Sequence, residues 1–365
     1  MSHKYVLLKE VCEKASSNIA QKDLAECDGI YPIYGASGYI KSVDFFQQAK
    51  DYIAIVKDGA GIGRAMKLPA KSSVIGTMQY VLPKDNINIS YLYYAICSMH
   101  LEKYFSGATI PHIYFRDYQN EQLPLPTLEE QAKIANVFGR IDYFIKKEKE
   151  QLINLDKLVK SRFIEMFGDP ITNTKRWPAD KVEAVCSNIY GGGTPSKSKD
   201  EYWNGDIPWI SSKDMKSDMI SDSQIRITNL GLDNSSAKLV PMNSVIMVIR
   251  SGILKHTLPV AINTVPVTVN QDLKVFIPSA SIHYRFLAFL FKMLEKDILA
   301  GVRAVTADNI EFDTLKNRKI ILPPVQLQNE FASFVTQVDK SKLAIQKSLD
   351  KLETLKKSLM QQYFG

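Results

Sequence analysis

The chain contains one segment that is written twice. Residues 125–168 and 322–365 align without a gap at a constant offset (322 − 125 = 197), are identical at 12 of 44 positions and both end in Phe-Gly. A repeat of long period indicates a molecule built from similar units in tandem. We therefore expect two like units, each made of a domain followed by a long helix.

The repeated segment has the pattern of a helix that pairs along its length. Its apolar residues recur at steps of three and four, with a period near 3.5 that is typical of a coiled coil. In the first copy they are Ile134, Phe138, Ile141, Ile145, Leu152, Leu155, Val159 and Met166. In the second copy they are Phe331, Val335, Val338, Ile345, Leu349, Leu352, Leu359 and Tyr363.

Charged residues interrupt this seam at different places in the two copies. Lys342 and Lys356 stand where the first copy has Ile145 and Val159. Glu148 and Arg162 stand where the second copy has Ile345 and Leu359. About 38 residues of helix at 1.5 Å each span some 55–60 Å. The pattern predicts two unequal helices packed on each other as a spacer, with the charges fixing the register. The alternative, an amphipathic pair buried in one globule, leaves no place for the charged run at 146–150.

The segments between the helices predict mixed α+β domains. Residues 1–124 hold strand patterns at 52–57 and 78–83, a glycine-rich turn at 58–64 and an amphipathic helix near 90–105. Residues 169–321 repeat this order: VIMVIR ends at Arg250, a Ser251-Gly252 turn follows, VTVNQDLKVFIP ends at Pro278 and a helix runs near 283–297. The repeat therefore covers the domains as well as the helices.

Composition excludes several classes of protein. The chain has no run of 18 apolar residues and no signal peptide, so we expect a soluble, cytoplasmic protein without a membrane partner. The four cysteines, Cys12, Cys27, Cys97 and Cys186, lack C-x-x-C spacing, which argues against a zinc site or a disulfide framework. The net charge of +7 is compatible with a polyanionic partner but does not establish one.

No catalytic constellation is evident. GAGIGR at 59–64 has Arg64 where a dinucleotide-binding fingerprint needs glycine, and it fails the P-loop pattern. The five histidines are not at metal-ligand spacing, and no carboxylate pair stands out as acid and base. An adenine-methylation motif of the Asn-Pro-Pro-Tyr type and a nuclease signature are also missing. We therefore predict that the chain is not an enzyme.

The motifs together resemble one known family. The duplicated LPTLEEQAKIANVFGRID block with its MFGDP ending, then GGGTPSK, YWNGDIPWISSKDM and a second LPPVQLQ helix, is similar to the specificity subunit of type I restriction-modification systems. The resemblance covers essentially the whole chain. It implies two pseudo-repeated target recognition domains, 1–124 and 169–321, separated by a long antiparallel coiled-coil pair of conserved helices, the central 125–168 and the distal 322–365.

The resemblance also implies partners. Each domain is expected to read one half of a split site in double-stranded DNA, and the helices to dock two adenine-modifying subunits, with restriction and translocase subunits joining them. The chain itself is expected to bind no cofactor, because S-adenosylmethionine, ATP and Mg belong to those partners. One departure is that the first domain lacks the Gly-Thr-Pro and Ile-Pro-Trp elements, so its recognition surface cannot be transferred by motif.

Candidate DNA contacts are polar and cationic residues at strand ends and loops, where side chains can reach phosphates or base edges. In the first domain they are Lys57, Arg64, Lys67, Thr77, Gln79, His112, Tyr114 and Arg116. In the second they are Thr194, Ser196, Lys197, Ser211, Ser212, Lys213, Arg250, Lys255, Asn270 and Gln271.

Each candidate has a structural alternative. Gly191–Gly193 can be a flexible turn, Trp203 and Trp209 can anchor loops, Arg64 and Arg250 can form surface ion pairs, and His112 can be structural. Three other functions also stay open: an enzyme that itself methylates or cuts DNA, a protein-binding scaffold without DNA, and the specificity subunit of a methylation-only or type IIB-like system.

Overall fold

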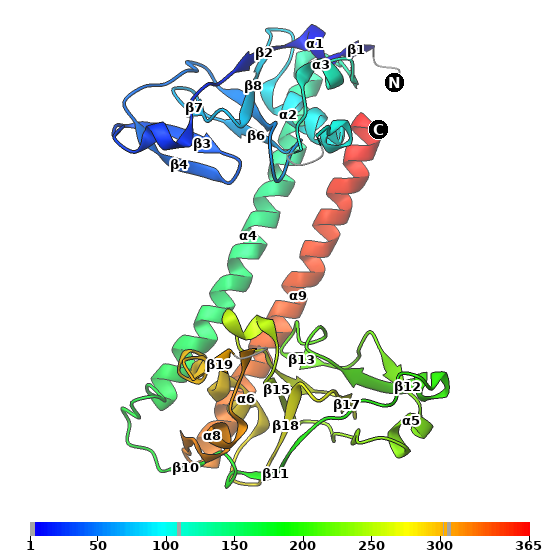
Figure 1. Cartoon of the computed structure of the whole chain (residues 1–365). Coiled ribbons are helices and arrows are strands. Elements are labelled where there is room, and N and C mark those ends of the chain that lie inside the picture. The colour runs from blue at the N-terminus through cyan, green and yellow to red at the C-terminus, as the bar shows by residue number, and fades with distance from the viewer. Residues whose placement is uncertain (1–3, 108–110, 302, 305–307) are drawn as a thin grey trace. The chain divides into compact units, whose positions relative to one another are not determined.

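The computed structural model describes residues 4–107, 111–301, 303–304 and 308–365. These fall into two compact units (Figure 1): unit 1 comprises residues 1–151 and 345–365, and unit 2 comprises residues 152–344. Both units combine sheets and helices, so the predicted α+β fold is confirmed. In the described part of the chain, no helix has the length and apolarity needed to cross a membrane.

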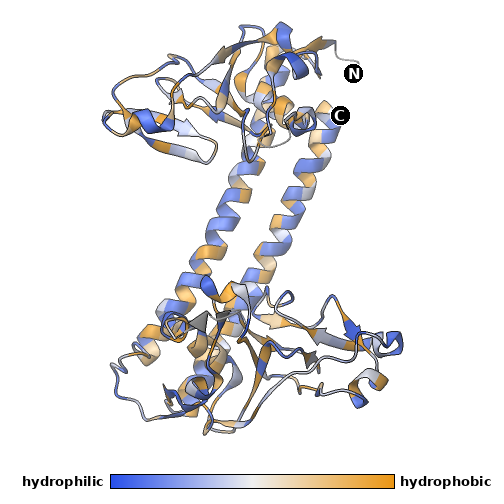
Figure 2. Ribbon diagram, in the orientation of Figure 1, coloured by the Kyte–Doolittle hydropathy of each residue, from blue (hydrophilic) through white to orange (hydrophobic). Residues whose placement is uncertain are grey.

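The two predicted long helices are present as α4 (Leu128–Phe167) and α9 (Val325–Phe364). Helix α4 begins after a capping box, in which the Thr127 hydroxyl accepts the Glu130 N–H and the Glu130 carboxylate accepts the Thr127 N–H. It ends at Gly168, whose φ of +76° is a left-handed conformation that favours glycine. Apolar and charged residues alternate along both helices (Figure 2).

Within each unit the two helices run antiparallel. In unit 1 the Lys356 ammonium lies 2.6 Å from Asp142, and the Lys149 ammonium lies 3.0 Å from Glu353. The residue number of the partner on α9 therefore falls as the residue number on α4 rises. In unit 2 Lys342 pairs with Asp156. Of the four predicted seam interruptions, Lys342 and Lys356 thus pair with carboxylates of the other helix. Glu148 accepts a hydrogen bond from the Ser348 hydroxyl of the other helix, whereas Arg162 pairs with Glu165 of its own helix.

Six residues of the predicted seam are buried, namely Phe138, Ile141, Val159, Phe331, Val338 and Leu349. The seam prediction did not include Phe163 and Phe167, and both are fully buried. They pack against Phe286 and Phe331 in the core of unit 2.

Unit 1 is built on an antiparallel sheet in the order β2-β8-β5-β6 and a smaller sheet in the order β4-β3-β7. The central strand β5 is buried along its whole length, as a hydrophobic run between two neighbours requires. Its strands are β1 (Tyr5–Leu7), β2 (Cys12–Ser16), β3 (Tyr31–Gly35), β4 (Gly38–Val43), β5 (Tyr52–Val56), β6 (Ala65–Leu68), β7 (Ser73–Val74), β8 (Met78–Pro83) and β9 (Gln122–Pro124). Its short helices are α1 (Leu8–Val11), η1 (Gln21–Leu24), α2 (Ile89–Ser98), η2 (Leu101–Tyr104) and α3 (Phe115–Tyr118).

Unit 2 repeats this plan with sheets in the orders β11-β18-β15-β16-β13 and β14-β12-β17. Its strands are β10 (Ala179–Lys181), β11 (Cys186–Gly191), β12 (Trp203–Ile210), β13 (Met219–Ile220), β14 (Arg226–Ile227), β15 (Val245–Val248), β16 (Val260–Asn263), β17 (Thr268–Val269), β18 (Leu273–Pro278), β19 (Arg303–Ala304), β20 (Asp308–Asn309) and β21 (Lys319–Ile321). Its short helices are η3 (Asp200–Tyr202), α5 (Asn229–Asp233), η4 (Gly252–Lys255), α6 (Tyr284–Met293), α7 (Glu295–Leu299) and α8 (Phe312–Asn317).

A buried glutamine holds the long helix to its domain in both units. In unit 1 the Asn88 N–H donates to Gln131 Oε1 at 2.7 Å, and Gln131 Nε2 donates to the Pro126 carbonyl at 2.9 Å. In unit 2 the His283 N–H donates to Gln328 Oε1 at 2.8 Å, and Gln328 Nε2 donates to the Pro323 carbonyl at 2.8 Å. The sequence repeat thus corresponds to a repeat of hydrogen bonds.

Candidate nucleic-acid interface

The central strand of each unit ends at a corner with the same backbone hydrogen bonds. In unit 1 the N–H groups of Lys57 and Asp58 donate to the Thr77 carbonyl at 3.0 and 3.3 Å. In unit 2 the N–H groups of Ile249 and Arg250 donate to the Asp272 carbonyl at 2.9 and 3.3 Å. Asp58 and Arg250 therefore occupy equivalent positions. We call residues 57–58, 77 and 112 the unit 1 corner, and residues 249–250 and 270–272 the unit 2 corner.

Several predicted contact residues meet at the unit 2 corner. The Gly193 N–H donates to the Val269 carbonyl at 3.0 Å, and the Asn270 N–H donates to the Ile210 carbonyl at 2.9 Å. The Thr194 hydroxyl donates to Gln271 Oε1. The loop that follows β11 and the end of β12 are thereby held against the residues that follow β17.

The glycine run of this loop is a packing requirement. A Cβ on Gly192 would lie 2.0 Å from the Val269 oxygen, and one on Gly193 would lie 2.3 Å from the Ser236 hydroxyl oxygen. Only glycine allows so close an approach of two backbones. Close packing therefore requires glycine at positions 192 and 193.

The two tryptophans anchor this region, as their structural alternative proposed. Trp209 is 7% exposed and its indole N–H donates to the Gly193 carbonyl at 2.9 Å. The Trp203 indole N–H donates to the Ser196 carbonyl at 3.1 Å. The two rings pack edge to face with centroids 5.5 Å apart.

Arg250 is both exposed and held in place. Its Nε and one terminal nitrogen lie 2.7 and 2.6 Å from Asp272 Oδ1, and its side chain is 49% exposed. Asn270 Nδ2 donates to the other oxygen of Asp272 at 3.2 Å, and the Asp272 N–H donates to Asn270 Oδ1 at 3.1 Å. Asn270 itself is only 7% exposed, so it supports Asp272 from within the fold.

The other predicted residues of unit 2 lie around this corner with different degrees of constraint. The Ser211 hydroxyl donates to Asp214 at 2.7 Å, which places it in a local turn. The Ser196 and Ser198 hydroxyls lie 2.9 Å apart on the loop after β11. Lys197, Lys213 and Lys255 are exposed, and Ser212 is half-buried.

The unit 1 corner carries a carboxylate where unit 2 carries a guanidinium. His112 Nδ1 lies 2.9 Å from Asp58 Oδ1, and the Lys57 ammonium lies 3.7 Å from Asp58 Oδ2. The His112 and Tyr114 rings stack with centroids 6.2 Å apart, and the Arg116 guanidinium lies 4.7 Å from the Tyr114 ring centre. Lys57, Tyr114 and Arg116 are thus near one another, while His112 takes the structural role of binding Asp58.

The remaining predicted residues of unit 1 are spread over three environments. Gln79 is 3% exposed and accepts the Tyr118 hydroxyl at 3.2 Å, so it lies inside the unit and cannot reach a ligand from there. The Lys67 ammonium donates to the Ser90 hydroxyl at 2.9 Å, and Arg64 donates to the Ala36 carbonyl. Thr77 is exposed at the corner.

The glycine-rich turn beside Arg64 is a hairpin turn between β5 and β6. Gly59, Gly61 and Gly63 have φ values of +84°, +86° and +80°, which side chains disfavour. The Gly63 N–H donates to the Val56 carbonyl at 2.9 Å, and a Cβ on Gly63 would lie 2.6 Å from the Glu102 nitrogen. Chain reversal and packing account for these glycines.

The first domain contains a strand equivalent to β12, although it lacks the Ile-Pro-Trp element. In unit 2, β12 pairs in parallel with β17 through Trp209↔Thr268 and Ile210↔Val269. In unit 1, β3 pairs in parallel with β7 through Ile33↔Ser73 and Tyr34↔Val74. Pro32-Ile33-Tyr34 thus takes the place of Pro208-Trp209-Ile210. A proline followed by two large apolar residues was the signal for this match.

The sequence prediction also missed three charged residues of these surfaces, namely Asp58, Asp272 and Lys274. The Lys274 ammonium lies 4.3 Å from the Phe312 ring centre, next to Gly191, where a Cβ would lie 2.8 Å from it. Burial lowers the pKa of Lys274, and the neighbouring Lys316 adds to this effect while Asp313 opposes it. Lys274 adds positive charge beside the loop that carries Thr194.

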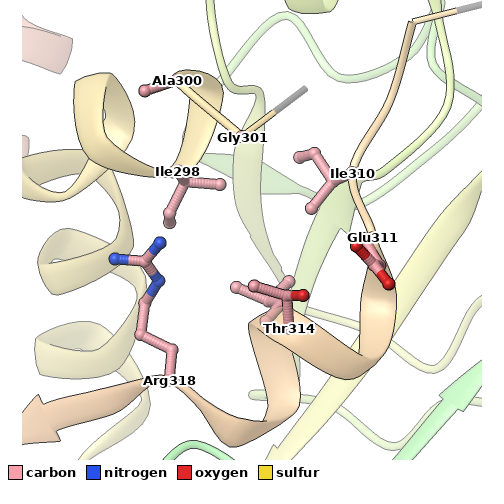
Figure 3. Close-up of a pocket in the computed structure, with 8 residues that line it drawn as sticks. Ile298, Ala300, Gly301, Ile310, Glu311, Thr314 and Arg318 are labelled. Atoms are coloured by element: carbon pink, nitrogen blue, oxygen red, sulfur yellow. The ribbon is translucent and has the colours of Figure 1, made fainter. Parts of the chain in front are cut away.

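A pocket in unit 2 (Figure 3) is lined by Ile298, Ala300, Gly301, Ile310, Glu311, Thr314, Leu315 and Arg318. Arg318 pairs with Asp297, so its charge is compensated within the protein. The lining combines apolar side chains with the polar side chains of Glu311, Thr314 and Arg318. We assign no ligand to this pocket.

Comparison with known proteins gives consistent results. Residues 3–156 and 180–357 match the family model for the type I restriction modification DNA specificity domain. The chain is 29% identical over 259 residues to the Type I restriction enzyme EcoR124I/EcoR124II specificity subunit of Escherichia coli. That alignment covers 69% of this chain and 63% of the E. coli protein, which is less than two thirds of its length.

More distant proteins match over larger parts of the chain. The Type I restriction enzyme MjaIX specificity subunit of Methanocaldococcus jannaschii is 24% identical over 303 residues, covering 77% of this chain and 69% of that protein. The fold is similar to the crystal structure of a type-I restriction-modification S subunit from M. genitalium, with a TM-score of 0.67 and 16% identity. The superposition covers 100% of this chain and 96% of that one.

Proposed function

Because the chain belongs to the type I restriction modification DNA specificity family, we propose that it recognises a bipartite DNA target and directs adenine methylation and cleavage by partner subunits. Residues 1–124 read one half-site and residues 169–321 read the other. Residues 125–168 and 322–365 form the helices that set the gap between the half-sites.

One observation carries this proposal: the two corners share their backbone hydrogen bonds and differ in their side chains. The same backbone arrangement carries Asp58 in unit 1 and Arg250 in unit 2, which suits two domains that recognise different base sequences. Base identity is read by donor and acceptor patterns in the grooves, whereas phosphate contacts carry no sequence information. The exposed Lys197, Lys213 and Arg116 suit phosphate contacts around these corners.

The partners proposed are double-stranded DNA, two modification subunits and restriction or translocase subunits, in the cytoplasm. The chain binds no cofactor of its own in this scheme, and S-adenosylmethionine, ATP and Mg act on the partners. Leu128 and Val325, the first residues of α4 and α9, are 52% and 42% exposed. Two exposed apolar residues at equivalent positions support docking of two copies of one partner.

The experiment that tests this function is methylation mapping. The chain is co-expressed with the modification subunit of its own system in cells that lack other adenine methyltransferases, and the methylated adenines are sequenced. The expected result is one motif of two constant parts with a gap of fixed length. Cells with the modification subunit alone are the control. A methylated motif that is the same with and without the chain contradicts the proposal.

A second measurement separates this function from a scaffold that binds only proteins. Affinity for duplex DNA should fall linearly on a log–log plot against salt, because neutralising phosphates releases counterions. A scaffold without DNA contacts would show no such binding. Methylation without cleavage, after addition of every subunit, would instead support the methylation-only alternative.

A further inference from the structure

We propose that Asp58 and Arg250 are the base-reading residues of their units and that they read opposite hydrogen-bond partners. Arg250, positioned by Asp272, reads a guanine, and Asp58, positioned by His112, reads the amino group of a cytosine. This inference rests on the proposed function and adds to it the two residues, their bases and their supports.

The equivalence of Asp58 and Arg250 rests on their backbone hydrogen bonds. Asp58 and Arg250 each donate a backbone N–H to a carbonyl of the neighbouring strand, at Thr77 and Asp272. Each also follows a residue whose carbonyl accepts an N–H from a later segment, because Ile113 donates to Lys57 and Ile310 donates to Ile249, both at 2.9 Å. Two side chains at equivalent backbone positions of two similar units are expected to contact equivalent parts of the ligand that each unit binds.

The geometry at Arg250 favours reading over loose charge contact. Asp272 Oδ1 lies 2.7 Å from Nε and 2.6 Å from Nη2 of the guanidinium. Asn270 Nδ2 in turn donates a hydrogen bond to the other oxygen of Asp272. Nη1 makes no hydrogen bond to any described residue. A guanidinium fixed along one edge presents its outer nitrogens in one direction, which suits the O6 and N7 acceptors of guanine.

The charge of the unit 2 corner also favours base reading by Arg250. The Asp272 carboxylate offsets the Arg250 charge, so the pair adds little to general attraction for phosphates. A cationic residue that only binds phosphates would need no carboxylate partner. Lys197 and Lys213 are exposed and are suited to such phosphate contacts. Arg250 is therefore suited to discrimination rather than to binding strength.

At the unit 1 corner the same position offers an acceptor. His112 Nδ1 lies 2.9 Å from the acceptor Asp58 Oδ1, and no described residue donates a hydrogen bond to Oδ2. Cytosine presents an amino group in the major groove, and carboxylates accept from it. The Lys57 ammonium, 3.7 Å from Oδ2, reduces the repulsion between this carboxylate and nearby phosphates.

The test is selection from a random duplex library by the full-length chain co-purified with its modification subunit. The wild-type protein should enrich a two-part motif that contains a guanine in one half-site and a cytosine in the other. R250K keeps the charge but replaces the planar guanidinium fork, which Asp272 holds, with a single flexible ammonium. Preference for that guanine should therefore fall by roughly 5- to 150-fold. The other half-site and the salt slope should stay unchanged.

Asp272 is tested as a positioning residue. D272A should weaken selection for the same guanine as R250K, while D272N, which keeps an oxygen acceptor toward Arg250, should restore part of it. The matched control is D222N, because Asp222 Oδ1 holds Nε and a terminal nitrogen of Arg226 at 3.1 and 2.9 Å in the same unit. D222N should leave the guanine in the motif.

Asp58 is tested by D58N, which adds a donor to a group that only accepts. It should relax one cytosine position in the half-site that R250K leaves intact, and thermal unfolding should confirm that the variant folds. The proposal is overturned if folded R250K or D58N enriches the wild-type motif, or if both alter the same half-site. If the wild-type complex enriches no motif, the proposed function itself fails, which is a distinguishable result.

Discussion

Unit 1 and unit 2 share their internal hydrogen bonds and differ in the side chains exposed at their corners. The buried Gln131 and Gln328 make the same hydrogen bonds, and the corners close through the same carbonyl acceptors. At those corners, however, one unit shows a carboxylate and the other a guanidinium. Buried hydrogen bonds are expensive to leave unmade, whereas exposed positions tolerate change. A duplicated fold can therefore keep its frame while its two surfaces diverge.

The largest expected effect concerns the spacing of the two half-sites. Four residues inserted into both helices, between Glu148 and Leu152 and between Ile345 and Leu349, add about 6 Å of helix, close to two base pairs at about 3.4 Å each. Each half-site should stay unchanged while the gap in the methylated motif grows by about two. Unaltered spacing would show that the helices do not measure distance.

An insertion into α4 alone is the matched control. It shifts Asp142 relative to Asp156 by one helical turn, whereas their partners Lys356 and Lys342 keep their spacing on α9. We expect this single insertion to weaken the helix pairing and to reduce methylation. Equal methylation after single and double insertion would argue that pairing of the helices does not matter.

The next largest effect is expected at a pair of equivalent residues on the two long helices, Phe163 and Met360. Phe163 is fully buried and its ring packs against Phe167, Phe286 and Phe331, whereas the equivalent residue of α9, Met360, is half-buried. F163A should lower the free energy of unfolding of unit 2 by about 3–5 kcal/mol through the cavity it leaves. M360A should lower that of unit 1 by clearly less.

Fluorescence can assign such losses to one unit, because all three tryptophans, Trp177, Trp203 and Trp209, lie in unit 2. Urea unfolding followed by tryptophan emission should report F163A strongly and M360A hardly at all. Similar shifts for both variants would mean that the two units unfold together. The comparison between them would then need a probe in unit 1.

A smaller effect is expected at the repeated glutamines. Q328A leaves the buried His283 N–H and Pro323 carbonyl without their partner, and we expect a loss of about 2–4 kcal/mol in the free energy of unfolding of unit 2. Q131A should cause a similar loss in unit 1. Hydrogen exchange of amides at the start of each long helix would measure the two losses separately. A large loss for only one glutamine would contradict their equivalence.

The smallest expected effect comes from a difference between the N-cap residues of two equivalent helices, α2 and α6. Asn88 Oδ1 caps α2 by accepting the Ser90 and Tyr91 N–H groups, whereas His283 Nδ1 caps α6 by accepting the Arg285 N–H at 3.1 Å. Burial lowers the pKa of His283 below its ordinary value of 6.5, and Arg285 adds to this effect. Only the neutral ring can accept, so acid removes the cap in unit 2 alone.

The sign of this pH dependence follows from linkage. With a lowered pKa in the folded state, the contribution of His283 is fully present above pH 6.5 and is lost as the pH falls from there to the lowered folded value. We expect a loss of about 0.5–2 kcal/mol, the usual worth of an N-cap. H283N should make the tryptophan-monitored stability of unit 2 less dependent on pH in this window. An unchanged profile would assign the effect to other groups.

The sequence by itself determined the two long helices, the internal repeat and the family. A helix depends on contacts between residues three and four apart, so its period is visible locally, and Phe-Gly marks the end of both copies. The repeat made the second unit predictable from the first. Even the missed strand β3 carried its signal in Pro32-Ile33-Tyr34.

Only the tertiary structure decided which side chains meet at the corners. Arg250 and Asp272 are 22 positions apart and Asp58 and His112 are 54 apart, so no local pattern joins them. The same holds for Gln79, which reads as a polar candidate but lies in the interior because its strand is covered on both sides. Contacts between distant segments depend on how strands pair and on which face is buried, and these are properties of the folded sheet.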